Sequence, residues 1–245
     1  MDDGTDLSGL RLRDCLLRDT RLSNAWVEDV SITGMVAGLV VNGVDVTAYV
    51  DSELDRRYPE RRQARDAATA DELRAAWSRI SELWSETVAR AERLPETARF
   101  ERVDGEWSIA ETLRHLVFAT DAWAGRTILD RESPFHPLGL SHTEYPRDSA
   151  AAIGLDTEAS PTWSEVRKIR RDRQAQVDTI FARLADVDLE LVTRRSPAPG
   201  YPEEHPTVAQ CLHVVLGEEC EHRRYAERDL AVLESRLIER GVRHA

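Results

Sequence analysis

Four long segments of the chain carry apolar residues at helical spacing, and this periodicity limits the folds that the chain can adopt. The predicted helices cover residues 69–94, 108–129, 162–184 and 207–237. In the first segment the apolar residues recur every three or four positions and so lie on one stripe of a helix. They are Leu73, Trp77, Ile80, Trp84 and Val88. Four amphipathic helices of similar length predict a mainly α fold, a four-helix bundle, because each apolar stripe must pack against another.

Local signals mark where these helices begin. Ser108 and Glu111 have the spacing of a capping box, in which each side chain bonds the other residue's backbone N–H. Thr162 and Glu165 repeat this spacing at the start of the third helix. The second and third helices are separated by residues 131–161, a long loop rich in Pro, His and Ser. A connection of that length allows a packing order that differs from the order in the sequence.

The N-terminal segment has a different period, with an apolar residue at every fifth position. These residues are Leu7, Leu12, Leu17, Leu22, Val27 and Ile32. A period of five fits neither a helix nor a strand, and it resembles the pentapeptide-repeat pattern of square β-helices. An irregular arm of a few strands explains the same residues. We therefore expect a β-rich segment at 1–50 that includes a strand-like stretch at 38–50, a charged connector at 51–68, and the bundle at 69–240.

Composition excludes several classes of function. The formal net charge of -12 disfavours nucleic-acid binding, which requires a concentrated positive surface. We expect no membrane span, because no stretch offers about 18 consecutive apolar residues, and the acidic N-terminus lacks the apolar region of a signal peptide. Three cysteines, Cys15, Cys211 and Cys220, are too few for a disulfide framework. These features favour a cytoplasmic protein, and a homodimer is compatible with the predicted fold.

The fourth segment carries a pair of residues with metal-ligand spacing. Glu218 and His222 are one helical turn apart and share a face, with Glu219 close to it. Two ligands are too few for catalytic zinc, which takes about three from the protein. His115 lies in the middle of a nearly all-apolar helix, where a buried imidazole needs a partner. We therefore predict a metal site formed by His115, Glu218 and His222; a hydrogen-bonded core histidine and solvent-facing glutamates paired with arginines are the alternative interpretation.

Two phrases of the sequence carry a family resemblance. EWSIAETLRHLVFATDAW and CLHVVLGEECEHRRYAERDL resemble the DinB-like superfamily of metal-binding four-helix bundles, over residues 69–237. In that family one ligand is a histidine of the second helix and two more form an HxxxH pair on the fourth, which implies ligand roles for His115, Glu218 and His222. The glutamate at 218 departs from HxxxH and is similar to the ExxxH of the mycothiol-dependent maleylpyruvate isomerases.

The resemblance implies a reaction as well as a metal. It indicates a divalent ion, with Zn²⁺ preferred over Ni²⁺ or another metal, and a metal-dependent thiol transferase or isomerase. A low-molecular-weight thiol such as mycothiol would be the co-substrate, with a small-molecule electrophile as its partner. Two other functions stay open: a metal-dependent hydrolase in which Glu219 is the catalytic general base, and a non-catalytic bundle that binds a ligand or dimerises.

Other residues that could carry chemistry have simpler interpretations. Cys211 and Cys220 are predicted to be packing residues, and the loop histidines His136, His142 and His205 receive no role. Five of the six tryptophans are interpreted as packing residues of the core and of the ends of the bundle. They are Trp77, Trp84, Trp107, Trp123 and Trp163.

Overall fold

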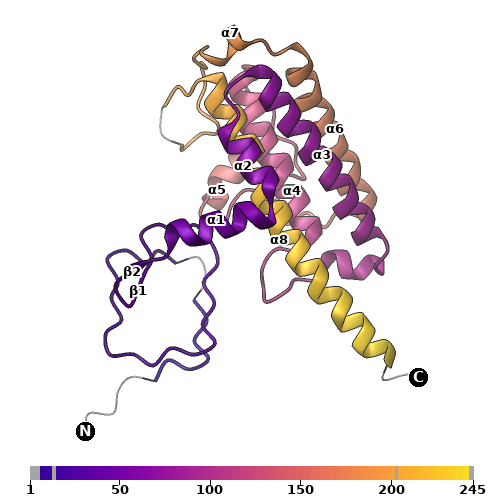
Figure 1. Ribbon diagram of the computed structural model, residues 1–245. Helices are drawn as coiled ribbons and strands as arrows, with labels where there is room; N and C mark the ends of the chain where they lie inside the picture. Colours follow the sequence, from indigo (N-terminus) through magenta and orange to yellow (C-terminus); the bar gives the residue numbers. More distant parts are fainter. Residues whose placement is uncertain (1–5, 13–14, 202–203, 243–245) are drawn as a thin grey trace. The chain divides into compact units, whose positions relative to one another are not determined.

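The computed structural model describes residues 6–12, 15–201 and 204–242, and within them the chain is mainly helical (Figure 1). The chain divides after Thr47 into two compact units. The second unit contains four long helices, as predicted. They are α3 (Ala70–Glu92), α4 (Ile109–Thr120), α6 (Trp163–Arg183) and α8 (Val208–Val242).

The order in which the four helices pack differs from their order in the sequence. Helix α3 lies beside α6 and α8, and α4 also lies beside α6 and α8 (Figure 1). The consecutive helices α3 and α4 are therefore diagonal to each other across the bundle. This arrangement brings the face of α4 directly against α8, which positions the site described below.

The predicted helix starts are confirmed. Ser108 and Thr162 both accept a hydrogen bond from the backbone three residues on, and the glutamates there return it, so both capping boxes form. The second helix also runs to the predicted length, but its last part is the π-helix η2 (Asp121–Ile128). The carboxylate of Asp121 is buried within η2 and pairs with Arg173 of α6, which joins the π-helix to the neighbouring helix.

Short elements complete the second unit. The 3₁₀-helix η1 (Glu96–Phe100) precedes α4, α5 (Arg147–Ala152) lies within the long loop, and α7 (Asp186–Leu189) follows α6. The main apolar core lies between the four long helices. A second, smaller cluster forms where the long loop meets the bundle. It includes Phe118, Phe135, Tyr145 and Leu155.

The segment 51–68, which we predicted to be a charged connector, is helical. It forms most of α1 (Thr47–Arg57) and all of α2 (Pro59–Asp66). Helix α2 packs against α3 and α8. The charges that suggested a connector make ion pairs across that contact: Glu60 pairs with Arg223 of α8. Ion pairs of this kind therefore help to hold α2 against the bundle.

The first unit contains only a small hairpin. Strands β1 (Val40–Val41) and β2 (Val44–Asp45) pair antiparallel around Asn42 and Gly43, whose φ angles of 50° and 83° suit a tight hairpin turn. The strand-like stretch that we predicted to reach residue 50 ends earlier, because α1 begins at Thr47.

A five-residue period is also present in the backbone of the first unit. Left-handed φ angles recur at Gly9, Asp19, Asn24, Asp29 and Gly34. The apolar residues at every fifth position do not form a buried core, however, because they range from 54% exposed at Leu7 to 71% exposed at Leu22. The pentapeptide-repeat coil is therefore not confirmed within the residues that the structure describes.

Among those residues, no helix combines the length and the hydropathy that a membrane-spanning segment needs.

Candidate metal centre

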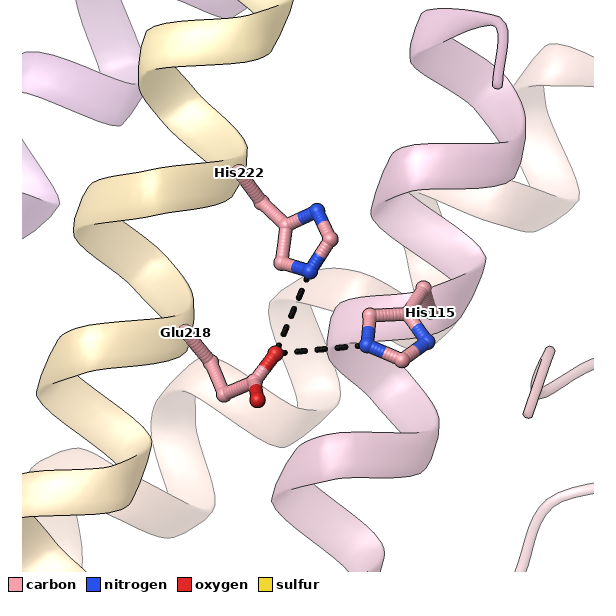
Figure 2. A group of neighbouring side chains, drawn as sticks. All are labelled: His115, Glu218 and His222. Atoms are coloured by element: carbon pink, nitrogen blue, oxygen red, sulfur yellow. Dashed lines mark hydrogen bonds and ion pairs between the residues drawn. The ribbon is translucent and has the colours of Figure 1, made fainter. Parts of the chain in front are cut away.

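Helices α4 and α8 bring the three predicted ligands together (Figure 2). His115 points from α4 toward α8, where Glu218 and His222 lie one turn apart on the same face. Oε2 of Glu218 is 3.2 Å from Nε2 of His115 and 3.1 Å from Nε2 of His222. The two imidazole rings are 4.6 Å apart between centroids. The three residues that we predicted as ligands are therefore neighbours in the folded chain.

These distances suit a tetrahedral metal site. Zinc binds imidazole nitrogen and carboxylate oxygen at about 2.0–2.1 Å, so neighbouring ligand atoms of a tetrahedron lie about 3.3 Å apart. The two distances to Oε2 of Glu218 are close to that value, and all three ligand atoms lie within 4.8 Å of one another. An ion could be held at their centre with only small side-chain movements.

A hydrogen bond on the far side of His115 determines which nitrogen can bind a metal. Nδ1 of this imidazole is 3.0 Å from the backbone oxygen of Leu140. A carbonyl oxygen can only accept, so Nδ1 carries the hydrogen and donates it. In the neutral ring Nε2 then has a free lone pair, and Figure 2 shows this nitrogen directed at Glu218. Metal-binding histidines are usually oriented by a second hydrogen bond of this kind.

Burial keeps this histidine neutral. It lowers the pKa of His115 below its ordinary value, and the nearby imidazole of His222 lowers it further, against the opposite effect of Glu218. Burial also opposes the ionisation of Glu218, but a proton shared with either neighbouring imidazole outweighs burial and holds the pKa of this carboxyl well below its ordinary value. An ionised carboxylate and a neutral imidazole are the forms that bind a metal ion.

The structure adds a residue that sequence reasoning had assigned to packing. The ring of Trp107 lies 4.7 Å from that of His115 and 6.0 Å from that of His222, between centroids. It therefore packs beside both imidazoles. The position of Trp107 immediately before the capping residue Ser108 is the only sequence signal that could have placed it at the N-terminal end of α4, near the histidine.

Glu219 occupies a different environment from the three ligands. Nη2 of Arg170 donates to both of its carboxylate oxygens, and both side chains are only 1% exposed. Its backbone oxygen accepts a hydrogen bond from Nε1 of Trp84. Burial raises the pKa of Glu219, and Arg170 acts in the opposite direction. The structure thus gives Glu219 a partner in α6 and does not place it in the group of three ligands.

Other polar residues of α8 lie outside the ligand group. Glu221, one turn before Tyr225 and next to His222 in the sequence, pairs with Arg61 and Arg224. Cys211 and Cys220 are buried free thiols, which agrees with packing roles.

The fold and the site together define a class of protein: a four-helix bundle whose second and fourth long helices present two imidazoles and a carboxylate to one point. A family model agrees with this description. The model of the DinB superfamily matches residues 79–226, which is more than half of the chain and includes all three candidate ligands. The chain belongs to the DinB superfamily. No curated protein and no solved structure gives a significant match.

Proposed function

We propose that the chain binds one divalent metal ion through His115, Glu218 and His222. The observation that carries this proposal is the convergence of three electron-pair donors, of which His115 is buried and Glu218 and His222 are partly buried. In the neutral ring of His115, Nε2 cannot donate to Glu218 while Nδ1 donates to Leu140, so two acceptors would face each other at 3.2 Å. Such a contact is unfavourable unless a cation or a proton lies between the two atoms.

The donor set favours zinc among the common ions. Two imidazole nitrogens and one carboxylate oxygen are typical ligands of catalytic Zn²⁺, which leaves a fourth position open. Nickel and other transition metals accept the same donors, so geometry and supply select among them. Magnesium and calcium prefer sites made only of oxygen ligands and suit this group less well.

We infer that the protein is a thiol transferase or isomerase that uses a low-molecular-weight thiol. A divalent ion held at this site would supply a Lewis acid that lowers the pKa of a bound thiol, which then reacts as thiolate. Two neutral imidazoles and one carboxylate neutralise only part of the ion's charge, so an anionic sulfur is favoured there. The resemblance of Glu218 and His222 to the ExxxH of mycothiol-dependent isomerases supports mycothiol as the thiol.

Each nearby side chain has a role in this proposal. The Leu140 carbonyl fixes the tautomer and the orientation of His115. Trp107 packs beside the two imidazoles and supports their orientation. Glu219 argues against the hydrolase alternative, because its carboxylate is engaged by Arg170 and a general base must reach the proton that it removes.

The test is conjugation of a thiol to a chromogenic electrophile by zinc-loaded protein. We expect acceleration over the uncatalysed reaction, and loss of that acceleration in His222→Ala with helicity retained, because three-ligand binding is lost while the apolar core is untouched. His205→Ala is the matched control, since His205 is exposed.

A companion titration separates the thiol from the metal. Mycothiol, bacillithiol and glutathione are each titrated calorimetrically into the zinc-loaded and the zinc-free protein. The proposal expects at least one of them to bind only when zinc is present. If none binds to the zinc-loaded protein, the thiol-dependent reaction is wrong even when the metal site is right.

A further inference from the structure

Two polar side chains from separate loops meet near the metal centre and have no part in the function proposed above. His142 belongs to the loop between η2 and α5, and Tyr201 belongs to the loop between α7 and α8. The Tyr201 hydroxyl lies 3.2 Å from Nδ1 of His142, and the two rings meet edge to face. Tyr145 holds the same two loops together, because its hydroxyl donates to the backbone oxygen of Pro199 at 2.7 Å.

Phe118 links this pair to the metal ligands. Its ring centroid is 6.2 Å from that of His115 and 6.3 Å from that of His142. The charge of Glu218 also acts electrostatically on both members of the pair. Burial raises the pKa of Tyr201 to about 12, and the carboxylate of Glu218 adds to this rise. The pair therefore lies within electrostatic range of the proposed ion.

The pair has one hydrogen-bond donor to spare. Burial lowers the pKa of the His142 imidazole, so at neutral pH the histidine is neutral and the phenol keeps its proton. A neutral imidazole and a phenol together have one N–H and one O–H, and their mutual bond uses one of them. Whichever tautomer forms, the other hydrogen stays available, and no second partner bonds either side chain among the residues that the structure describes. Both side chains are only partly buried, so a ligand can reach them.

We propose that Tyr201 and His142 form a subsite that binds a carboxylate group of the electrophilic substrate next to the metal centre. This inference rests on the proposed function, because it assigns the place of the second substrate. A free donor close to a positively charged ion suits a carboxylate oxygen. The rings of Phe118 and Tyr201 beside the donor suit a carboxylate that is carried on an apolar body.

Benzoate is a probe with these properties, and its binding can be measured without any reaction. It is titrated calorimetrically into zinc-loaded and zinc-free protein, for wild type and for Tyr201→Phe. We expect Tyr201→Phe to weaken benzoate binding at least about tenfold, since the phenol either donates to the carboxylate itself or fixes the tautomer of His142 that does. Tyr49→Phe is the matched control, because Tyr49 is an exposed residue of α1, and it should bind benzoate as wild type does.

A second variant checks that the loss of benzoate binding does not come from a change of fold. His142→Leu removes the other half of the pair and should weaken benzoate to a similar extent, while both variants keep the zinc affinity of wild type. Equal benzoate affinity in Tyr201→Phe and wild type overturns the subsite, as does the absence of benzoate binding to wild type with and without zinc.

The two proposals fail in different ways. If wild type catalyses thiol conjugation but Tyr201→Phe binds benzoate normally, only the subsite is wrong. If benzoate binding depends on Tyr201 while none of the three thiols binds, the carboxylate subsite stands and the thiol-dependent reaction is wrong.

Discussion

Replacing Glu219 by leucine should destabilise the protein severely, because it leaves a buried guanidinium without its partner. Both Arg170 and Glu219 are 1% exposed. Nε and Nη1 of Arg170 have no hydrogen-bond partner among the described residues, so the guanidinium depends on this carboxylate. Breaking a buried ion pair by removing one partner costs about 3–5 kcal/mol. The missing partners place the expected loss of unfolding free energy in the upper part of that range.

The double variant Arg170→Leu/Glu219→Leu should recover most of the loss. Replacing a buried pair by apolar residues of similar volume is often neutral or stabilising, since neither charge is then desolvated. Urea denaturation of the zinc-free proteins measures Glu219→Leu, Arg170→Leu and the double variant and keeps metal binding out of the comparison. This reasoning would be refuted if Glu219→Leu lost less than about 1 kcal/mol of unfolding free energy. It would also be refuted if the loss in the double variant equalled the sum of the losses in the two single variants.

The same residue tests the hydrolase alternative. Glu219→Gln keeps the shape of the side chain and removes its charge. A structural role predicts a loss of stability with unchanged zinc affinity. A catalytic base instead predicts that hydrolytic activity of the zinc-loaded protein disappears while stability is kept, and that outcome would contradict the role we assign.

Three further predictions concern other parts of the chain. Deleting residues 1–46 should leave zinc affinity unchanged, because all three ligands lie in the second unit; a truncated protein that is still helical but binds no zinc would contradict this. In the folded protein only Cys15 should react rapidly with a thiol-specific reagent at pH 8, because Cys211 and Cys220 are buried and burial raises the pKa of Cys220 to about 12; mass spectrometry of the labelled peptides would reveal a second reactive site. Ser108→Ala should cost about 1 kcal/mol in urea denaturation, since the N-cap bond of α4 is lost; an unchanged midpoint would show that the cap contributes nothing.

The positions of the four long helices could be predicted because their signals are local. Apolar spacing defines a helix within about two turns, and the capping boxes at Ser108 and Thr162 mark the start of two helices within a few residues. The candidate ligands could be predicted for the same reason. Glu218 and His222 are one turn apart, and His115 is conspicuous in an apolar helix, so only the contact between α4 and α8 had to be assumed.

The features that the sequence did not reveal depend on contacts between distant residues. A run of charges such as that at 51–68 is typical of a solvated connector, and only its contacts with α3 and α8, including the ion pair of Glu60 with Arg223, make α2 a packed helix. Glu219 and Glu218 are neighbours of the same residue type, yet Arg170 buries one and the imidazoles surround the other. The partnership of His142 with Tyr201 joins residues 59 positions apart, which no local pattern encodes.

The number of zinc ions bound per chain tests the central claim most directly. Untagged protein is stripped of metal and titrated with Zn²⁺ in competition with a chromophoric chelator, alongside the variant His115→Ala/Glu218→Ala/His222→Ala. The three-ligand site predicts about one zinc ion per wild-type chain and none in the triple variant. Equal zinc binding by the two proteins, or no binding by wild type, would contradict a metal centre formed by these three residues.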